Sequence, residues 1–318
     1  MLMVSKTTHI FKKVDNLNLK VDAYLPTASE ESWSTAVLYL HGGGLVALDR
    51  EWLPTHVAQA CMIRGWPLFS ADYRLMPQAS GRDMLEDVIA AYDFVRTKLL
   101  TKPSFDENTK IVLMGASAGG YLSFIAKPHL QPPPVAVFSY YGPPTCHDPF
   151  YSSNKVIGPS PLSKSQFERY FEGPVTAGPT PSGLPGFDVA SLLADYSRDP
   201  KWILAPPGDI DDRSSLYYWL VQENKLPEMW ADVDPGWESS ALKDFGKTII
   251  VHGDVDEVVP YYMSEKFVSI NSPGDVQLFT ALGKNHAWDA PLFLGDPELK
   301  VVEEAWRALD KIVAEAKG

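Results

Sequence analysis

The feature that most constrains the fold of this chain is a run of small residues, Gly-Ala-Ser-Ala-Gly-Gly, at positions 115–120. An apolar run at 110–114 precedes it, so the sequence predicts a strand, a tight turn with Ser117 at its tip, and a helix that begins there. Glycine at 115 and 119 removes side chains that would collide with the flanking strand and helix. The first N–H groups of such a helix favour negative charge beside the serine.

Strand-like and helix-like segments alternate along the chain. Several expected strands, such as 36–40 and 248–251, are nearly continuous apolar runs, which is typical of strands buried on both faces of a parallel sheet. The segment 17–23 alternates instead and predicts an antiparallel edge strand with one face in water. We therefore expect an α/β fold with a mostly parallel, doubly wound sheet flanked by helices. Expected strands are 17–25, 36–40, 67–73, 110–114, 135–140, 248–252 and 276–281, and expected helices are 82–100, 121–126, 261–270 and 297–317.

Residues 143–240 interrupt this alternation. They are rich in proline, glycine and aromatic residues and contain helical patches near 163–171 and 214–223. Because a structureless loop of this length is improbable inside a compact domain, we expect an inserted helical cap over the carboxyl-terminal edge of the sheet. The core would then consist of residues 1–142 and 241–318. The aromatic side chains of the cap would either line a substrate pocket or hold the cap to the core.

The composition excludes several classes of protein. The chain has 318 residues, of which 45% are apolar and 21% charged, so it can bury a large core. Its net charge of −12 disfavours binding to nucleic acid or anionic lipid. No apolar run approaches the ~18 residues of a membrane span, residues 1–9 lack the features of a secretory signal, and two cysteines, Cys61 and Cys146, suit a reducing compartment. We therefore expect a cytoplasmic monomer or homodimer that acts on a small molecule, without nucleic-acid partners or an integral membrane segment.

Three residues in chain order suit nucleophilic catalysis. A serine hydroxyl becomes reactive when a base takes its proton, and the base works best when a third group orients it. His286 and Asp256 follow the last two expected strands, where open α/β sheets place their sites. We predict Ser117 as nucleophile, His286 as general base and Asp256 as orienting acid. Asp254 is the alternative acid, although it could instead cap a turn, and His252 is expected to pack beside the sheet edge.

A second glycine-rich run, His-Gly-Gly-Gly-Leu at 41–45, follows the expected strand 36–40. Backbone N–H groups in such a run can approach a reacting carbonyl and stabilise its developing negative oxygen. We predict Gly43, Gly44 and Ala118 as these donors and expect Leu45 to touch the substrate. The run lacks the spacing of a phosphate loop, and we expect neither a metal nor a cofactor.

Three motifs together resemble the α/β-hydrolase superfamily, and most closely its hormone-sensitive-lipase-like carboxylesterase branch. They are HGGG at 41–44, DYRLMP at 72–77 and GASAGG at 115–120. The resemblance implies an α/β-hydrolase fold and a serine hydrolase with the triad and oxyanion donors named above. The chain departs from the branch at Ala116, where aspartate is usual, and in the Met-Pro-Gln at 76–78, where Ala-Pro-Glu is usual. Its segment 253–260 is closer to peptidase-like and dienelactone-hydrolase-like members.

The sequence therefore predicts a metal-independent serine esterase that cleaves carboxylic esters of small or medium acyl or aryl substrates through an acyl-enzyme. The departures from the carboxylesterase branch leave this chemistry intact, but they do not determine the class of substrate. A lactonase, an arylformamidase or a thioesterase acting on a secondary metabolite would use the same acyl step. A ligand-binding or cyclase-like protein without net hydrolysis is a further alternative, against which the presence of Ser117, Asp256 and His286 together argues.

Overall fold

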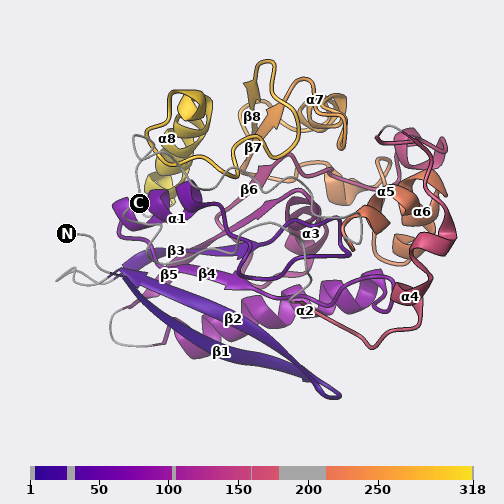
Figure 1. The fold of residues 1–318 in the computed structure, drawn as a ribbon. Coiled ribbons are helices and arrows are strands. Elements are labelled where there is room, and N and C mark those ends of the chain that lie inside the picture. The colour runs from indigo at the N-terminus through magenta and orange to yellow at the C-terminus, as the bar shows by residue number, and fades with distance from the viewer. Residues whose placement is uncertain (1–3, 27–32, 102–104, 159, 179–212, 317–318) are drawn as a thin grey trace.

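Eight strands form one sheet in the order β1-β2-β4-β3-β5-β6-β7-β8 (Figure 1). The computed structural model describes residues 4–26, 33–101, 105–158, 160–178 and 213–316. Strand β2 pairs antiparallel with β1 and β4, and the strands from β4 to β8 pair in parallel. The strands are β1 (Val4–Val14), β2 (Leu17–Pro26), β3 (Trp33–Leu40), β4 (Leu68–Ala71), β5 (Phe105–Ala116), β6 (Ala136–Tyr140), β7 (Thr248–Gly253) and β8 (Val276–Ala281).

The apolar runs form strands because both faces of the sheet are covered. Along β3, Ala36 and Leu38 point into one hydrophobic core, whereas Val37 and Tyr39 point into the other, and none of these side chains is exposed. Successive side chains of a strand point to opposite faces, so a strand between two cores is apolar at every position. The predicted α/β fold with a mostly parallel central sheet is confirmed.

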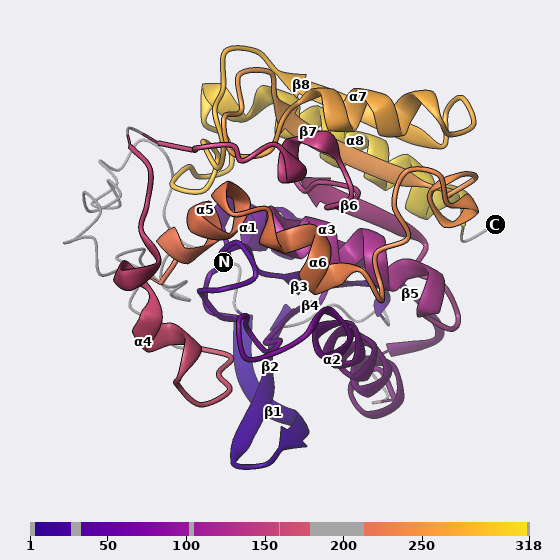
Figure 2. The same ribbon diagram turned by 90° about the vertical axis from the view of Figure 1, so that its right-hand side faces the viewer.

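Helices cover the two faces of the sheet. Helices α1 (Thr55–Ile63) and α8 (Lys300–Glu315) pack into one core, and α2 (Gly81–Phe94), α3 (Ala118–Ala126) and α7 (Tyr262–Ser269) pack into the other (Figures 1 and 2). Helix α8 buries the apolar stripe expected from its sequence and leaves its polar side in water. A π-helical turn, Val95–Leu99, continues α2. Short 3₁₀ turns lie at Lys127–His129, Pro149–Ser152, Lys164–Gln166, Ser240–Leu242 and Pro297–Leu299.

The expected strand at 17–25 is present as β2, but the prediction that its segment 17–23 lies at the edge of the sheet is wrong. Strand β1 pairs along the whole of β2 and takes the edge position itself. Most of β2 is therefore buried, and the side chain of Asp22 is not exposed at all. Polar residues dominate β1, which is largely exposed, so it lacks the apolar pattern by which a strand is recognised. Helix α1 was also not predicted, because seven of its residues are buried and its apolar residues mark no single face.

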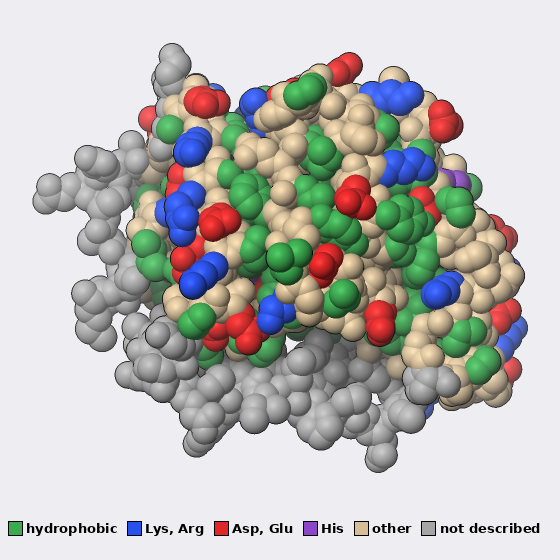
Figure 3. All heavy atoms as spheres, turned by 90° about the horizontal axis from the view of Figure 1, so that it is seen from above, with side chains coloured by type: hydrophobic (Ala, Val, Ile, Leu, Met, Phe, Trp, Pro, Cys, Tyr) green, Lys and Arg blue, Asp and Glu red, His purple; other side chains and the backbone are tan. Residues whose placement is uncertain are grey.

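Three short helices of the predicted cap, α4 (Glu168–Phe171), α5 (Ser215–Gln222) and α6 (Lys225–Trp230), lie on the same side of the molecule (Figures 1 and 2). Residues 159 and 179–212 of that predicted cap lie outside the described residues. On the face drawn in Figure 3, acidic and basic side chains are interspersed and do not form a patch of one sign. Within the described part of the chain, no helix combines the length and the apolar character that crossing a bilayer requires.

Candidate active site

Ser117 occupies a strained turn between β5 and α3. Its backbone has φ 52° and ψ −116°, a conformation that costs a non-glycine residue about 1–3 kcal/mol and is concentrated at functional sites. The Ser117 N–H donates to the Tyr140 carbonyl at 2.8 Å, which ties the turn to β6. A Cβ atom at Gly119 would lie 2.0 Å from the Leu40 carbonyl oxygen, so only glycine allows the turn to approach the end of β3.

The fold brings the three predicted catalytic side chains together. The Nε2 atom of His286 lies 2.9 Å from Oγ of Ser117, and its Nδ1 atom lies 2.7 Å from Oδ2 of Asp256. Since Nδ1 faces a carboxylate, it carries the proton, and Nε2 is left to accept the serine hydroxyl. The three residues follow β5, β7 and β8, whose carboxyl ends meet at one edge of the sheet.

Asp256 is held on both carboxylate oxygens. Its Oδ1 atom accepts the N–H groups of Val258 at 2.8 Å and Val259 at 2.9 Å. Burial acts to raise the pKa of Asp256, but the charge of His286 and the hydrogen bonds from His252 and His286 outweigh it and hold the pKa below its usual range. Asp256 therefore stays ionised beside the imidazole.

Asp254, the alternative acid, has different surroundings. Its side chain is exposed, and its Oδ1 atom accepts the N–H of Gly283. Asp254 thus links the segment that follows β7 to the segment that follows β8, whereas Asp256 faces His286.

The loop that carries His286 is fixed from several directions. The side-chain oxygen of Asn285 accepts the N–H of Glu257 at 3.0 Å and that of His286 at 2.7 Å, which joins the two loops after β7 and β8. The ring of Tyr141 packs edge-on against His286 at 4.7 Å between centroids. Three residues further on, Oδ2 of Asp289 lies 2.8 Å from Nε2 of His56, and both side chains are fully buried.

The second glycine run forms a turn beside Ser117. Gly43, Gly44 and Leu45 have φ values of 98°, 61° and 66°. Neither the N–H groups of Gly43 and Gly44 nor that of Ala118 finds a hydrogen-bond acceptor among the described residues. Backbone N–H groups without a protein acceptor can donate to an oxyanion. Two of these residues, Gly44 and Ala118, line the same cavity as Ser117.

Buried side chains hold this turn in place. The Tyr73 hydroxyl donates to the carbonyls of His41 at 2.8 Å and Gly42 at 3.1 Å, and its ring stacks on His41 at 4.1 Å. Burial lowers the pKa of His41 to about 3, so this imidazole is neutral at physiological pH. Arg213 donates from Nε to the Val46 carbonyl at 2.5 Å and from Nη2 to the Met76 carbonyl at 2.7 Å.

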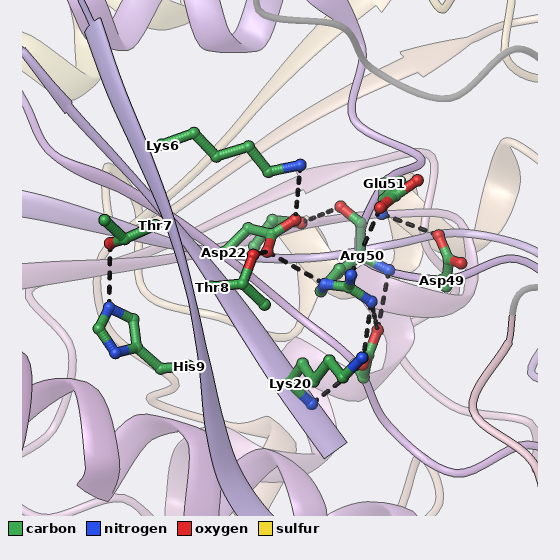
Figure 4. A network of polar contacts seen from close by, with 11 residues as sticks. Lys6, Thr7, Thr8, His9, Lys20, Asp22, Asp49, Arg50 and Glu51 are labelled. Carbon is green, nitrogen blue, oxygen red and sulfur yellow. Dashed lines mark hydrogen bonds and ion pairs between the residues drawn. The ribbon is translucent and has the colours of Figure 1, made fainter. Parts of the chain in front are cut away.

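A network of charges anchors the segment that follows the turn (Figure 4). The guanidinium of Arg50 lies 3.1 Å from Asp22 and 3.3 Å from Asp72, and the Arg50 N–H also donates to Asp72. Lys6 of β1 reaches the same Asp22 at 3.0 Å. Burial raises the pKa of Asp72 to about 6, which outweighs the opposing effect of Arg50. The network links β1, β2 and the strand end of β4 to the glycine turn.

A small cavity lies beside Ser117. No charged side chain occurs among the described residues that line it, and two of its tyrosines, Tyr151 and Tyr217, come from the predicted cap. Other aromatic residues of the predicted cap, including Trp219 and Trp230, pack in the main hydrophobic core. The lining residues are Gly44, Leu45, Ser117, Ala118, Tyr121, Pro143, Cys146, Tyr151, Tyr217, Leu226 and Val259.

Several contacts at the site were not predicted from the sequence. Arg213 lies almost one hundred residues from the motifs, and no local pattern links it to the glycine turn. His252, at the end of β7, contacts Asp256. The sequence feature that could have indicated this contact is the position of His252, four residues before Asp256, whose carboxylate also contacts His286. Among residues 4–26, 33–101, 105–158, 160–178 and 213–316, no group of three or more His, Cys, Asp or Glu side chains is arranged to hold a metal ion.

The sequence and the fold of this chain are similar to those of known proteins. Residues 21–129 match the BD-FAE family. The crystal structure of an α/β hydrolase superfamily protein from Enterococcus faecalis superposes on 98% of this chain and 99% of that chain with a TM-score of 0.67 at 20% identity. The chain therefore has the fold of the α/β hydrolases.

The relatives of this chain differ in size and description. A probable carboxylesterase M8 from Phoma sp. is 25% identical over 311 residues, which cover 89% of each chain. The non-reducing polyketide synthase Preu6 of Preussia isomera is 26% identical over 302 residues, or 89% of this chain. The chain spans only 14% of the length of that synthase. Carboxyl esterase 2 of Tuber melanosporum has a TM-score of 0.61 at 16% identity, over 98% of this chain and 88% of that one.

Proposed function

We propose that this protein, which has an α/β-hydrolase fold, is a serine hydrolase that cleaves uncharged carboxylic esters of small or medium acyl or aryl groups. The observation that carries the proposal is the hydrogen-bonded series from Ser117 Oγ to His286 at 2.9 Å and from His286 to Asp256 at 2.7 Å. An imidazole oriented by a carboxylate and bonded to a serine on a strained turn is the arrangement that activates a hydroxyl. The uncharged lining of the cavity supports a neutral substrate group.

Each step uses groups of the chain itself. His286 Nε2 takes the proton of Ser117 as Oγ attacks the ester carbonyl carbon, and the resulting oxyanion accepts hydrogen bonds from Gly43, Gly44 and Ala118. His286 then gives that proton to the departing alkoxide, and the carbon–oxygen bond breaks to leave an acyl-serine. Water attacks the acyl-serine with His286 again as base, which releases the acid and restores Ser117. Asp256 stabilises the charged imidazole throughout.

The test is turnover of p-nitrophenyl esters of graded acyl length by the wild-type protein and by Ser117→Ala. The proposal predicts hydrolysis that falls by at least about 10³-fold in the variant. If Ser117→Ala kept more than a few per cent of the activity, the proposed nucleophile would be wrong. Lactone and formamide substrates in the same panel test the lactonase and arylformamidase alternatives, and labelling by a fluorophosphonate separates any serine hydrolase from a binding protein.

A second candidate is hydrolysis of acyl thioesters. The observation that favours it is the match to non-reducing polyketide synthases, two of which, Preu6 and atr1 of Stereocaulon alpinum, match over 89% of this chain. Thioester and ester share the acyl-serine, so the same residues would serve both. The test compares kcat/KM for an acyl thioester with kcat/KM for the oxygen ester of the same acyl group. A preference of more than about 10-fold for one of them identifies it as the substrate class.

The proposal also covers the cap, the cellular location and the oligomeric state of the protein. We infer a cap over 143–240 that covers the serine, because helix α5 supplies Tyr217 and the turn Pro149–Ser152 supplies Tyr151 to the cavity. Cys61 and Cys146 are buried and unbridged, which agrees with a cytoplasmic location. A monomer or homodimer remains our expectation, and size-exclusion chromatography with light scattering measures it.

A further inference from the structure

His252 is a fully buried histidine at the end of β7 that the proposed chemistry does not use. Its Nε2 atom lies 3.2 Å from Oδ2 of Asp256 and 3.0 Å from the Val259 carbonyl oxygen. Its Nδ1 atom lies 2.7 Å from Oγ of Ser264, in α7. Two histidines thus approach one carboxylate oxygen, since His286 reaches the same Oδ2 at 2.7 Å.

The surroundings of His252 determine where its proton lies. Both neighbours of Nε2, the carboxylate of Asp256 and the carbonyl of Val259, can only accept, so Nε2 must carry hydrogen. In the neutral ring, Nδ1 then accepts the Ser264 hydroxyl, which can donate. A single N–H shared between two acceptors also explains why both of its distances exceed the 2.7 Å of the bond from His286.

With this bond, every oxygen of the Asp256 carboxylate has two donors. Oδ1 accepts from Val258 and Val259, and Oδ2 accepts from His252 and His286. A carboxylate bonded on all sides neither rotates nor takes up the proton of the imidazole it orients. Loss of the His252 bond would leave Oδ2, the oxygen that faces His286, with a single donor.

We propose that His252 is a positioning residue, whose Nε2–H fixes and helps to keep ionised the carboxylate of Asp256 that orients His286. The proposal rests on the proposed function, because it assigns His252 a role in the same triad. The rival view is that His252 only joins β7 to α7 through Ser264 and the Val259 carbonyl.

Two amide variants separate these views. In His252→Gln, the side-chain amide reaches the position of Nε2 and can donate to Asp256, whereas in His252→Asn it reaches only the position of Nδ1. Positioning predicts that His252→Asn lowers kcat by about 10- to 100-fold with KM within about 2-fold, and that His252→Gln restores kcat to within about 3-fold of wild type. A purely structural role predicts equal losses in both variants, or parallel losses in kcat and melting temperature, and either result would overturn the proposal.

A second readout is coupling between His252 and Asp256. In an Asp256→Asn background, the carboxylate that receives the bond is gone, so adding His252→Asn should change kcat by less than about 2-fold. Additive losses would contradict positioning. If His252→Asn does not fold, the ¹⁵N spectrum of the wild-type imidazoles decides, with the His252 signals assigned by their absence in His252→Gln. The proposal requires a protonated Nε2 that shifts in Asp256→Asn, and an unprotonated Nε2 would refute it.

Failure of this inference is distinguishable from failure of the proposed function. If the wild-type protein labels at Ser117 with a fluorophosphonate but the two amide variants do not differ, only the role of His252 is wrong. If Ser117→Ala retains turnover and Ser117 does not label, the triad and the role of His252 fall together.

Discussion

A Cβ atom at Gly44 would lie 2.5 Å from Cβ of Tyr217, so helix α5 packs directly on the glycine turn beside Ser117. This contact joins a proposed oxyanion donor to a wall of the cavity. The same residue, Gly44, has φ 61° and an N–H without an acceptor among the described residues. In the proposed mechanism, access of the substrate and stabilisation of the oxyanion therefore both depend on the contact between Gly44 and Tyr217.

Substitution of Gly44 by alanine should disable the turn. The added methyl group would displace either the Tyr217 side chain or the donor N–H, and we expect kcat to fall by about 10²–10³-fold. Gly65→Ala is the matched control, because Gly65 has a similar φ of 64° and a Cβ atom there would contact nothing within 4 Å. Steady-state kinetics of both variants measure the effect. A comparable loss in Gly65→Ala would mean that backbone strain, and not the position of the donor, is responsible.

Removal of the Tyr217 ring should enlarge the cavity. In Tyr217→Ala, we expect the ratio of kcat/KM for hexanoyl over acetyl esters to rise by about 10-fold or more, because each methylene that gains an apolar contact contributes 1–3 kcal/mol. Tyr218→Ala is the control, since Tyr218 neighbours Tyr217 but is absent from the cavity lining. An unchanged ratio in Tyr217→Ala would show that the acyl group binds elsewhere.

The two candidate acids make opposite predictions. Asp256→Asn should lower kcat by about 10³–10⁴-fold, because an amide cannot hold the imidazole in the required tautomer or stabilise its charge. Asp254→Asn should lower kcat by less than about 3-fold, since Asp254 bonds the N–H of Gly283. Kinetics on one ester, with melting temperatures to verify folding, compare them. A larger loss in Asp254→Asn would reassign the acid.

Much of this site followed from local sequence patterns, and the remainder depends on distant contacts. Strands such as 36–40 were predictable because strands buried on both faces have continuous apolar runs. The position of Ser117 at a tight turn was predictable because such a turn needs small neighbouring residues. Strand β1 was missed because it lies at an exposed edge. Arg213 bonds the Val46 carbonyl and His252 bonds the Asp256 carboxylate, and only the folded chain brings these groups within reach of one another.

His41 should make the protein sensitive to acid. Burial lowers the pKa of His41 to about 3, whereas an unfolded histidine titrates near 6.5. The unfolded chain therefore binds the proton first, and the contribution of neutral His41 to stability, present above pH 6.5, is lost progressively as the pH falls toward 3, by up to about 5 kcal/mol. Urea unfolding at pH 7, 5.5 and 4.5 measures this loss. His41→Gln should reduce the slope, whereas His129→Gln, at an exposed position, should not.

The most direct test of the account is to trap the nucleophile. The wild-type protein is incubated with a fluorophosphonate, and the modified residue is located by mass spectrometry of its peptides, with His286→Ala treated in parallel. The account predicts one phosphonyl group on Ser117 and labelling at least about 10²-fold slower in His286→Ala, because the imidazole removes the serine proton. A label on another residue, or equal rates in the two proteins, would contradict a serine activated by His286.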